Sequence, residues 1–179
     1  TEIFKTFDET PIAAASIAQV HFATLHNGEE VAVKVLRPNV REAFASDLEL
    51  FFWLAKLVET NLPDLRRLKP VEVVQTFENS IQMELDLRFE ASAAMELRRN
   101  MENDEDFYVP SINWQFTAQR VLVLERIKGT KINEIETLKA KGHDLKKLLQ
   151  IASESFFNMV YRDGFFHADL HPGNMFVLD

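Results

Sequence analysis

The hydrophobic positions of the chain first alternate with a period of two and then recur with a helical period. Two short apolar segments, Val20–Leu25 and Val31–Leu36, flank the turn dipeptide Asn27-Gly28, which predicts a β-hairpin. A helix is predicted next over Arg41–Glu59, because apolar side chains recur there every three or four residues. The following segment, Asn61–Pro70, contains prolines and a basic cluster, as linkers do.

The second half of the chain predicts more helix, one strand pair and a final strand. Leu122–Leu124 lies in an apolar stretch that reads as an interior strand, and Gly129 ends it. The order of elements indicates an α+β fold without repeats. The predicted segments are a long helix at 71–101, strands at 109–112 and 120–125, helices at 133–141 and 145–163, and a strand at 175–178.

Composition excludes several classes of protein. The net charge of −8 argues against a general nucleic-acid binder, because such proteins carry a basic face. The absence of cysteine excludes disulfides and cysteine-based zinc sites. The first ten residues lack the apolar core of a signal peptide, and no apolar stretch reaches the roughly 18 residues of a membrane span.

The densest polar motif is H-A-D-L-H-P-G-N at 167–174. Pro172 and Gly173 prevent a regular helix, so we expect a loop between a helix and a strand. Its H-x-D-x-x-x-x-N spacing resembles the kinase catalytic loop, in which Asp169 would orient or deprotonate an acceptor hydroxyl and Asn174 would hold a metal ion. The alternatives are a capped surface turn and a metal site formed by His167, Asp169 and His171.

Lys34 is the second candidate. It shares a strand face with Ala32 and Leu36, while valines form the other face. A lysine on an apolar face needs an anionic partner, unless its ammonium reaches solvent past the strand edge. The tetrapeptide V-A-V-K also resembles the kinase V-A-I-K, whose lysine holds nucleotide phosphates.

An alanine-rich segment precedes this hairpin. Aligned with the kinase glycine loop, A-A-A-S-I-A-Q-V places Ala13, Ala15 and Ala18 at the three glycine positions and Val20 at the valine. Alanine resists positive φ by roughly 1 kcal/mol, so we expect a stiffer loop of different shape from that of ordinary kinases. Read without this context, an alanine-rich segment is a common helix start.

Taken together, the alanine loop, V-A-V-K-V, E-L-D-L-R-F-E-A at 84–91 and H-A-D-L-H-P-G-N resemble the UbiB family of atypical kinases over nearly the whole chain. The resemblance implies a two-lobe, protein-kinase-like fold that binds ATP or ADP with Mg²⁺. It implies an N-lobe at 1–124 with added helices, and a hinge with the start of a truncated C-lobe at 125–179. The implied nucleotide-binding residues are Lys34 together with Ile12, Ala13, Ala14, Ala15, Ser16, Ile17, Ala18, Gln19 and Val20.

The resemblance also assigns Glu84 and Asp86 as the family's E-x-D pair. Two positions apart on a helix, they would point about 200° apart and would not serve one contact. We expect Glu84 to pair with Lys34, with Glu78 as the second choice. The alternative for each carboxylate is simple solvation on a helix surface.

Two family features are absent from the sequence: the K-x-G-Q segment and the D-F-G-type aspartate, for which Asp179 comes too early. We therefore expect a fragment that is inactive alone. For the full-length protein the resemblance implies a role in ubiquinone biosynthesis at the cytoplasmic face of the inner membrane. Its partners would be biosynthetic proteins and quinone-like lipids, with membrane contact through segments missing here. A small-molecule phosphotransferase of the aminoglycoside or choline kinase type and a pseudokinase-like regulator are the alternatives.

Overall fold

The computed structural model describes residues 2–168 and 170–178. These residues form two compact units, which are described separately. The first unit comprises Thr1–Ala91 and Trp114–Val123, and the second comprises Ser92–Asn113 and Leu124–Asp179. The predicted lobes, 1–124 and 125–179, stay a prediction.

The first unit is built on a sheet with strand order β1-β3-β4-β5, and β2 also pairs with β3. The predicted hairpin is confirmed, since β3 and β4 pair antiparallel from Ala18 opposite Leu36 to Thr24 opposite Glu30. Gly28 adopts φ 89° in the connecting turn, a conformation that favours glycine. The strands are β1 (Phe4–Phe7), β2 (Ala13–Ala14), β3 (Ala18–Leu25), β4 (Glu30–Leu36) and β5 (Val121–Glu125).

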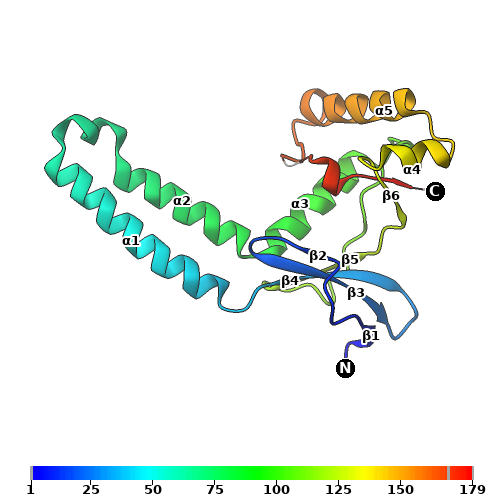
Figure 1. The fold of residues 1–179 in the computed structure, drawn as a ribbon, viewed down its shortest axis with the longest axis horizontal. Coiled ribbons are helices and arrows are strands. Elements are labelled where there is room, and N and C mark those ends of the chain that lie inside the picture. Colours follow the sequence, from blue (N-terminus) through cyan, green and yellow to red (C-terminus); the bar gives the residue numbers. More distant parts are fainter. Residues whose placement is uncertain (1, 169, 179) are drawn as a thin grey trace. The chain divides into compact units, whose positions relative to one another are not determined.

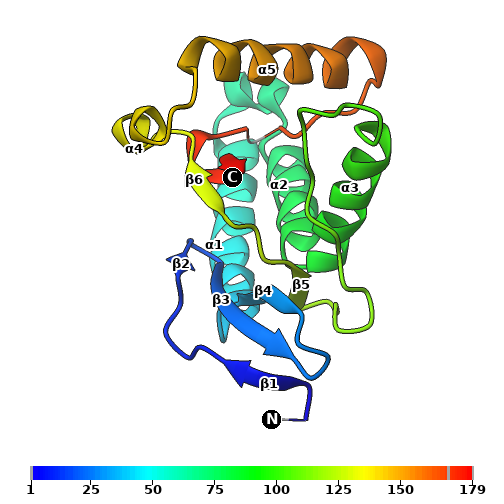
Figure 2. The same cartoon turned by 90° about the vertical axis from the view of Figure 1, so that its right-hand side faces the viewer.

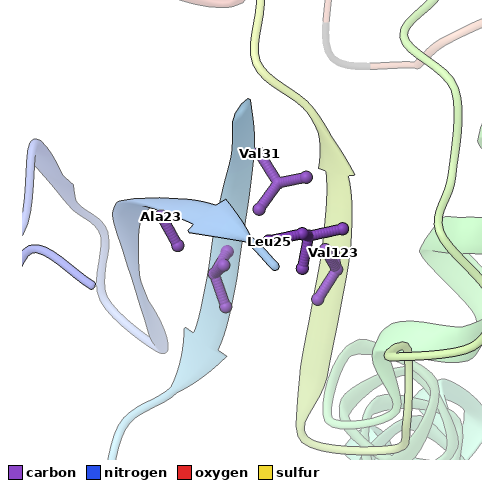
Figure 3. Packing of buried hydrophobic residues seen from close by; sticks show 5 residues of the cluster. Ala23, Leu25, Val31 and Val123 are labelled. Carbon is purple, nitrogen blue, oxygen red and sulfur yellow. The ribbon is translucent and has the colours of Figure 1, made fainter. Parts of the chain in front are cut away.

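One face of this sheet forms the core of the unit. Side chains from β3, β4 and β5 meet there (Figure 3), and Val31 and Val123 are fully buried. Phe4 and Phe7 of β1 pack against the same cluster. The alternation predicted for β4 is therefore confirmed on its valine face, and the opposite face of the strand carries Lys34. The buried cluster consists of Ala23, Leu25, Val31, Val33 and Val123.

A helical hairpin extends from the sheet within this unit. Helix α1 (Val40–Asn61) confirms the predicted helix and runs beside α2 (Pro70–Glu84), as Figures 1 and 2 show. The predicted linker between them contains a short 3-10 helix, Pro63–Leu68. No described helix is long and apolar enough to cross a membrane.

The long helix predicted over 71–101 is two helices, and the single-helix prediction is wrong. Helix α3 (Leu87–Asn100) starts after a break at Leu85 and Asp86. Two bonds from elsewhere in the unit hold the break: Arg41 donates to the Leu85 carbonyl at 2.6 Å, and the Leu87 amide donates to the Gln119 carbonyl at 3.0 Å. These bonds satisfy backbone groups at the point where α2 ends and α3 begins.

The second unit is mainly helical and has its own core. Leu97, Met101, Val109 and Met159 are buried together, and Phe165 packs against them. Its further elements are β6 (Gly129–Lys131), α4 (Ile135–Ala140), α5 (Leu145–Phe157), a π-helical turn (Asn158–Arg162), a 3-10 turn (Pro172–Asn174) and β7 (Phe176–Leu178). The predicted helices at 133–141 and 145–163 are thus confirmed in type, with the last turn of the second one π-helical.

The strand predicted at 109–112 is wrong. Only one isolated bridge forms there, between Ile112 and Leu124. A side chain takes the place of strand pairing here. The Glu125 carboxylate accepts hydrogen bonds from the Ser111 amide at 3.1 Å, from the Ser111 hydroxyl at 2.9 Å and from the Tyr108 hydroxyl at 2.6 Å. Burial alone would raise the pKa of Glu125, but these bonds outweigh it and lower the pKa below its usual value.

The final strand pairs within the second unit. β7 runs antiparallel to β6, with Gly129 opposite Leu178. A Cβ at Gly129 would lie 2.5 Å from the Val177 carbonyl oxygen, closer than any real contact allows. The glycine therefore permits the close approach of the strand that follows the H-A-D-L-H-P-G-N motif.

Candidate functional site

Lys34 lies in the middle of β4, directly opposite Val20 of β3. Facing residues of an antiparallel pair project to the same side of the sheet. Lys34 therefore shares its face with Val20, and with the pair formed by Phe22 and Ala32. This face lies opposite the valine face that is buried in the core.

The ammonium of Lys34 is paired with Glu90. Its Nζ donates to the two carboxylate oxygens of Glu90 at 2.7 and 2.9 Å, and the Lys34 side chain is only 27% exposed. The expected partner, Glu84, is wrong, and so is the second choice, Glu78. Glu84 is the last residue of α2, and Glu78 accepts a bond from Gln75 at 2.6 Å. The helix break explains the difference, because it restarts the helical register at Leu87.

The E-x-D pair spans the break rather than one helix. Asp86 is buried and sits just before α3, where its carboxylate accepts the Arg88 amide at 3.1 Å, the bond of a helix N-cap. The Arg88 guanidinium binds both Asp86 oxygens at 2.6 and 2.9 Å. This side-chain bond lowers the pKa of Asp86 to about 2, despite the opposing effect of burial. The expectation of two carboxylates on one helix is wrong, and Asp86 has a structural role at the start of α3.

The alanine loop is a tight hairpin between β2 and β3 (Figure 1). Ala13 pairs with Val20, and Ala14 pairs with Gln19. Among the described residues, the only non-glycine residues with positive φ are Asn39 and Lys69. The alanines at the glycine-loop positions all have negative φ, so they carry none of the strain that a left-handed backbone conformation would impose on alanine.

The tip of this loop exposes backbone donors. The Ala15 amide is used within the tip, donating to the Ala18 carbonyl at 2.9 Å. The amides of Ser16 and Ile17, in contrast, donate no hydrogen bond to any described residue. Unpaired amides side by side in a turn attract anions.

In the second unit, the described residues of the H-A-D-L-H-P-G-N motif, 167–168 and 170–174, form no α-helix or strand, as predicted for a loop. His171 begins a 3-10 turn, with its Nδ1 accepting the Gly173 amide at 3.0 Å, and the Asn174 amide donates to the His171 carbonyl at 2.8 Å. Leu170 packs against the core of this unit. Asp169, the predicted catalytic residue, lies outside the described residues. The side chain of His171 therefore caps this turn, and the catalytic assignments of Asp169 and Asn174 stay predictions.

Few side chains in the described part of the chain are placed where they could bind a metal ion together. Within 2–168 and 170–178, no group of three or more histidine, aspartate or glutamate side chains is placed to hold a metal. Asn174 is exposed at the end of its turn, and its amide oxygen suits magnesium only together with carboxylates. The described residues therefore supply only a small part of a Mg²⁺ site.

A cavity of about 240 Å³ lies between α1 and α2. Arg41, Glu49, Glu78 and Gln82 contribute its polar groups, and phenylalanines and leucines line the rest. None of the predicted nucleotide-binding residues is among those that line it, so this cavity is not the predicted site.

Sequence reasoning missed Glu90, although it lies inside the quoted motif E-L-D-L-R-F-E-A. The clue was present: Asp86 is a preferred N-cap residue, and a helix that starts there places Glu90 one turn beyond the cap. Glu125 is predicted from the sequence only as the first residue of the hinge. Its bonds to Tyr108 and Ser111 involve polar groups of the segment that contains the predicted strand, and hydrophobic periodicity carries no information about such bonds.

Comparison with known proteins identifies the family. Residues 1–179 match the ABC1 atypical kinase-like domain. Two curated relatives are named probable protein kinase UbiB. One, from Aliivibrio fischeri strain MJ11, is 48% identical over 175 residues, which are 97% of this chain and 32% of the relative. The other, from Pseudomonas entomophila strain L48, is 49% identical over 176 residues, which are 98% of this chain and 33% of the relative.

A solved structure agrees with these matches. The structure titled as the complex of Rv3197 with erythromycin, from Mycobacterium tuberculosis, aligns with a TM-score of 0.75 and 32% identity. The alignment covers 99% of this chain and 44% of that one. The chain thus spans about a third of the curated relatives' length, and the resemblance found in its motifs is confirmed. It has an α+β kinase-like fold, and it belongs to the ABC1 atypical kinase-like family.

Proposed function

We propose that this chain is the nucleotide-binding part of an atypical kinase or ATPase that supports ubiquinone biosynthesis. One observation carries the proposal: the Lys34 ammonium is held by Glu90 on the sheet face that it shares with Val20 of the alanine loop. A pairing of this kind fixes a flexible ammonium at one position, where it is ready to meet a phosphate.

The alanine loop supplies the second group of contacts. The amides of Ser16 and Ile17 would donate to phosphate oxygens, and Lys34 would add its charge to the same anion. Val20 and Ala32 give the face beside Lys34 an apolar character, which suits a purine ring. ATP and ADP both fit this set of donors, since each combines an apolar ring with a polyphosphate.

The chemistry beyond binding rests on the H-A-D-L-H-P-G-N loop. We assign Asp169 the role of accepting a proton from the acceptor hydroxyl or water, and Asn174 that of a metal ligand. Bound Mg²⁺ would neutralise charge on the terminal phosphates. In the turn capped by His171, the backbone amide of Asn174 is held by the His171 carbonyl. This bond fixes the backbone from which the proposed metal ligand, the Asn174 side chain, extends.

The biological role follows the relatives' names and remains part of the proposal. Two relatives are called probable protein kinase UbiB, and the motifs imply action in ubiquinone biosynthesis at the cytoplasmic face of the inner membrane. Biosynthetic proteins and quinone-like lipids are the proposed partners. The erythromycin in the structural relative's title is a statement about that protein alone.

The binding test compares three variants of the full-length protein by calorimetry with ATP and ADP. Lys34→Ala removes the phosphate contact, and Glu90→Gln releases the ammonium, so both should weaken binding, by about tenfold or more for Lys34→Ala. Glu84→Gln is the matched control, because Glu84 ends α2 and does not bind Lys34; its affinity should equal that of the wild type. Unchanged affinity in folded Lys34→Ala protein would refute the proposed site.

The activity test measures ATP turnover by the full-length protein with and without quinone-like lipids. Turnover that rises with these lipids supports an ATPase or kinase in ubiquinone biosynthesis. Turnover that requires a small hydroxylated acceptor instead identifies a small-molecule phosphotransferase. Nucleotide binding without turnover under either condition identifies a pseudokinase-like regulator.

A further inference from the structure

Arg37 follows directly after β4 and bonds to the tip of the alanine loop at two points. Its backbone amide donates to the Ile17 carbonyl at 2.8 Å, and its side-chain Nε donates to the Ala15 carbonyl at 3.0 Å. The tip is also closed on itself by the bond from the Ala15 amide to the Ala18 carbonyl. The carbonyls of Ala15 and Ile17 are therefore turned to Arg37.

These bonds matter because little else holds the tip. The pairing of β2 with β3 ends at Ala14 and Gln19, and Ala13–Ser16 are exposed. A short, exposed turn with few tertiary contacts samples several conformations unless specific bonds restrict it. Arg37 provides two such bonds from the position directly after β4, and β4 is fixed in the sheet through the bond from the Leu36 amide to the Arg120 carbonyl.

We propose that Arg37 is a positioning residue for the nucleotide phosphates. By holding the carbonyls of Ala15 and Ile17, it keeps the amides of Ser16 and Ile17 presented at the tip. Lys34, three residues earlier on β4, supplies the ammonium, so β4 and the residue that directly follows it position both groups. This inference rests on the proposed nucleotide site and adds a residue that acts on phosphate through the loop.

A direct role in phosphate binding is the competing explanation, since a guanidinium binds phosphate well. The bond to the Ala15 carbonyl uses Nε of Arg37 and leaves the terminal N–H groups of the guanidinium, so the experiments below decide between the two explanations. The two explanations differ in a measurable way. An effect through the loop depends on how stiff the loop is, whereas a direct charge contact does not.

The first experiment measures affinity in the full-length protein for ATP and for adenosine, which lacks phosphates. Arg37→Gln should weaken ATP binding by about tenfold, the scale of one charge-assisted hydrogen bond, and leave adenosine binding unchanged. Arg120→Gln is the matched control, because it removes the same charge from an exposed side chain on the turn that leads into β5. It should bind both ligands like the wild type.

The second experiment is a double-mutant cycle with Ala15→Gly, which loosens the tip. If Arg37 acts by restraining the loop, its loss costs less ATP affinity in the glycine background than in the wild type, so the two effects are not additive. Amide hydrogen exchange of segment 12–19 without nucleotide gives a direct reading, and it should be faster in Arg37→Gln. The exchange rate measured without nucleotide depends on the stiffness of the loop and not on any contact between Arg37 and phosphate.

The outcomes separate this inference from the proposed function. Wild-type protein that binds no nucleotide refutes the function, and the exchange rates of segment 12–19 still decide whether Arg37 restrains the loop. If the wild type binds ATP and Arg37→Gln binds it equally well, the inference is overturned and the function stands. Equal losses for ATP and adenosine, or additive effects with unchanged exchange, also overturn it.

Discussion

The strongest quantitative prediction concerns Asp86, which sits at the break between α2 and α3. Replacing it with asparagine removes the charge that binds Arg88 and keeps a side chain that caps helices well. Replacing it with alanine removes the cap as well. The two variants therefore separate the ion pair from the cap.

The size of each effect follows from the structure. The pKa of Asp86 falls from 3.8 to about 2, and at ~1.4 kcal/mol per unit this sets an upper limit near 2.5 kcal/mol for the ion pair. The Arg88 side chain is 58% exposed, so solvent screening reduces the expected value to about 1 kcal/mol. Loss of the cap adds about 1 kcal/mol. We expect Asp86→Asn to lower the free energy of unfolding by about 1 kcal/mol and Asp86→Ala by about 2 kcal/mol.

The pH dependence has a definite sign. Since the pKa of Asp86 is lowered in the folded state, the unfolded chain binds more protons between about pH 4 and pH 2. The stabilisation is therefore fully present above pH 4 and is lost as the pH falls toward 2.

The assay is urea denaturation of the full-length protein, followed by circular dichroism at pH 7, 5, 4 and 3. The difference between the wild type and Asp86→Asn should be constant from pH 7 to 5 and should shrink below pH 4. Asp47→Asn, an exposed position on α1, is the control for a lost surface charge. A difference that is absent at pH 7, or that persists unchanged at pH 3, would show that the ion pair does not stabilise the fold.

Two further predictions concern the loop and the last strand pair. Replacing Ala13, Ala15 or Ala18 with glycine should change the ratio of ADP to ATP affinity measured by calorimetry, because the backbone gains freedom at the glycine-loop positions, whereas Ala14→Gly should change it less. Equal shifts in all four variants would refute the loop alignment. Gly129→Ala should separate β6 from β7 and speed amide exchange in 175–178, since its Cβ would meet the facing strand at 2.5 Å; unchanged exchange there would contradict the pairing.

The features that the sequence predicted well depend on local chemistry. Asn27-Gly28 and the alternating valines specify the β3–β4 hairpin without help from distant residues, and the pairing confirms it. The placement of Lys34 on the face opposite the valine core follows from the same period of two. The alanine loop was located by its position before this hairpin.

The features that the sequence predicted wrongly depend on distant partners. The carbonyl left free at the break accepts a bond from the guanidinium of Arg41, which lies far away in the sequence, while Asp86 caps the new helix locally. The lost strand at 109–112 results from the carboxylate of Glu125. The bonds from Arg41 to the Leu85 carbonyl and from the Ser111 amide to Glu125 join a backbone group to a side chain of another segment. The pattern of hydrophobic residues along the chain therefore does not predict them.

The break also gives the E-x-D motif a physical meaning. Asp86 fixes where α3 starts, and the start of a helix fixes the direction of every later side chain by the 100° turn per residue. Glu90 follows four positions after the cap and reaches the Lys34 ammonium. Two carboxylates of the segment 84–91 thus have different tasks: Asp86 caps α3 and binds Arg88, whereas Glu90 binds the Lys34 ammonium.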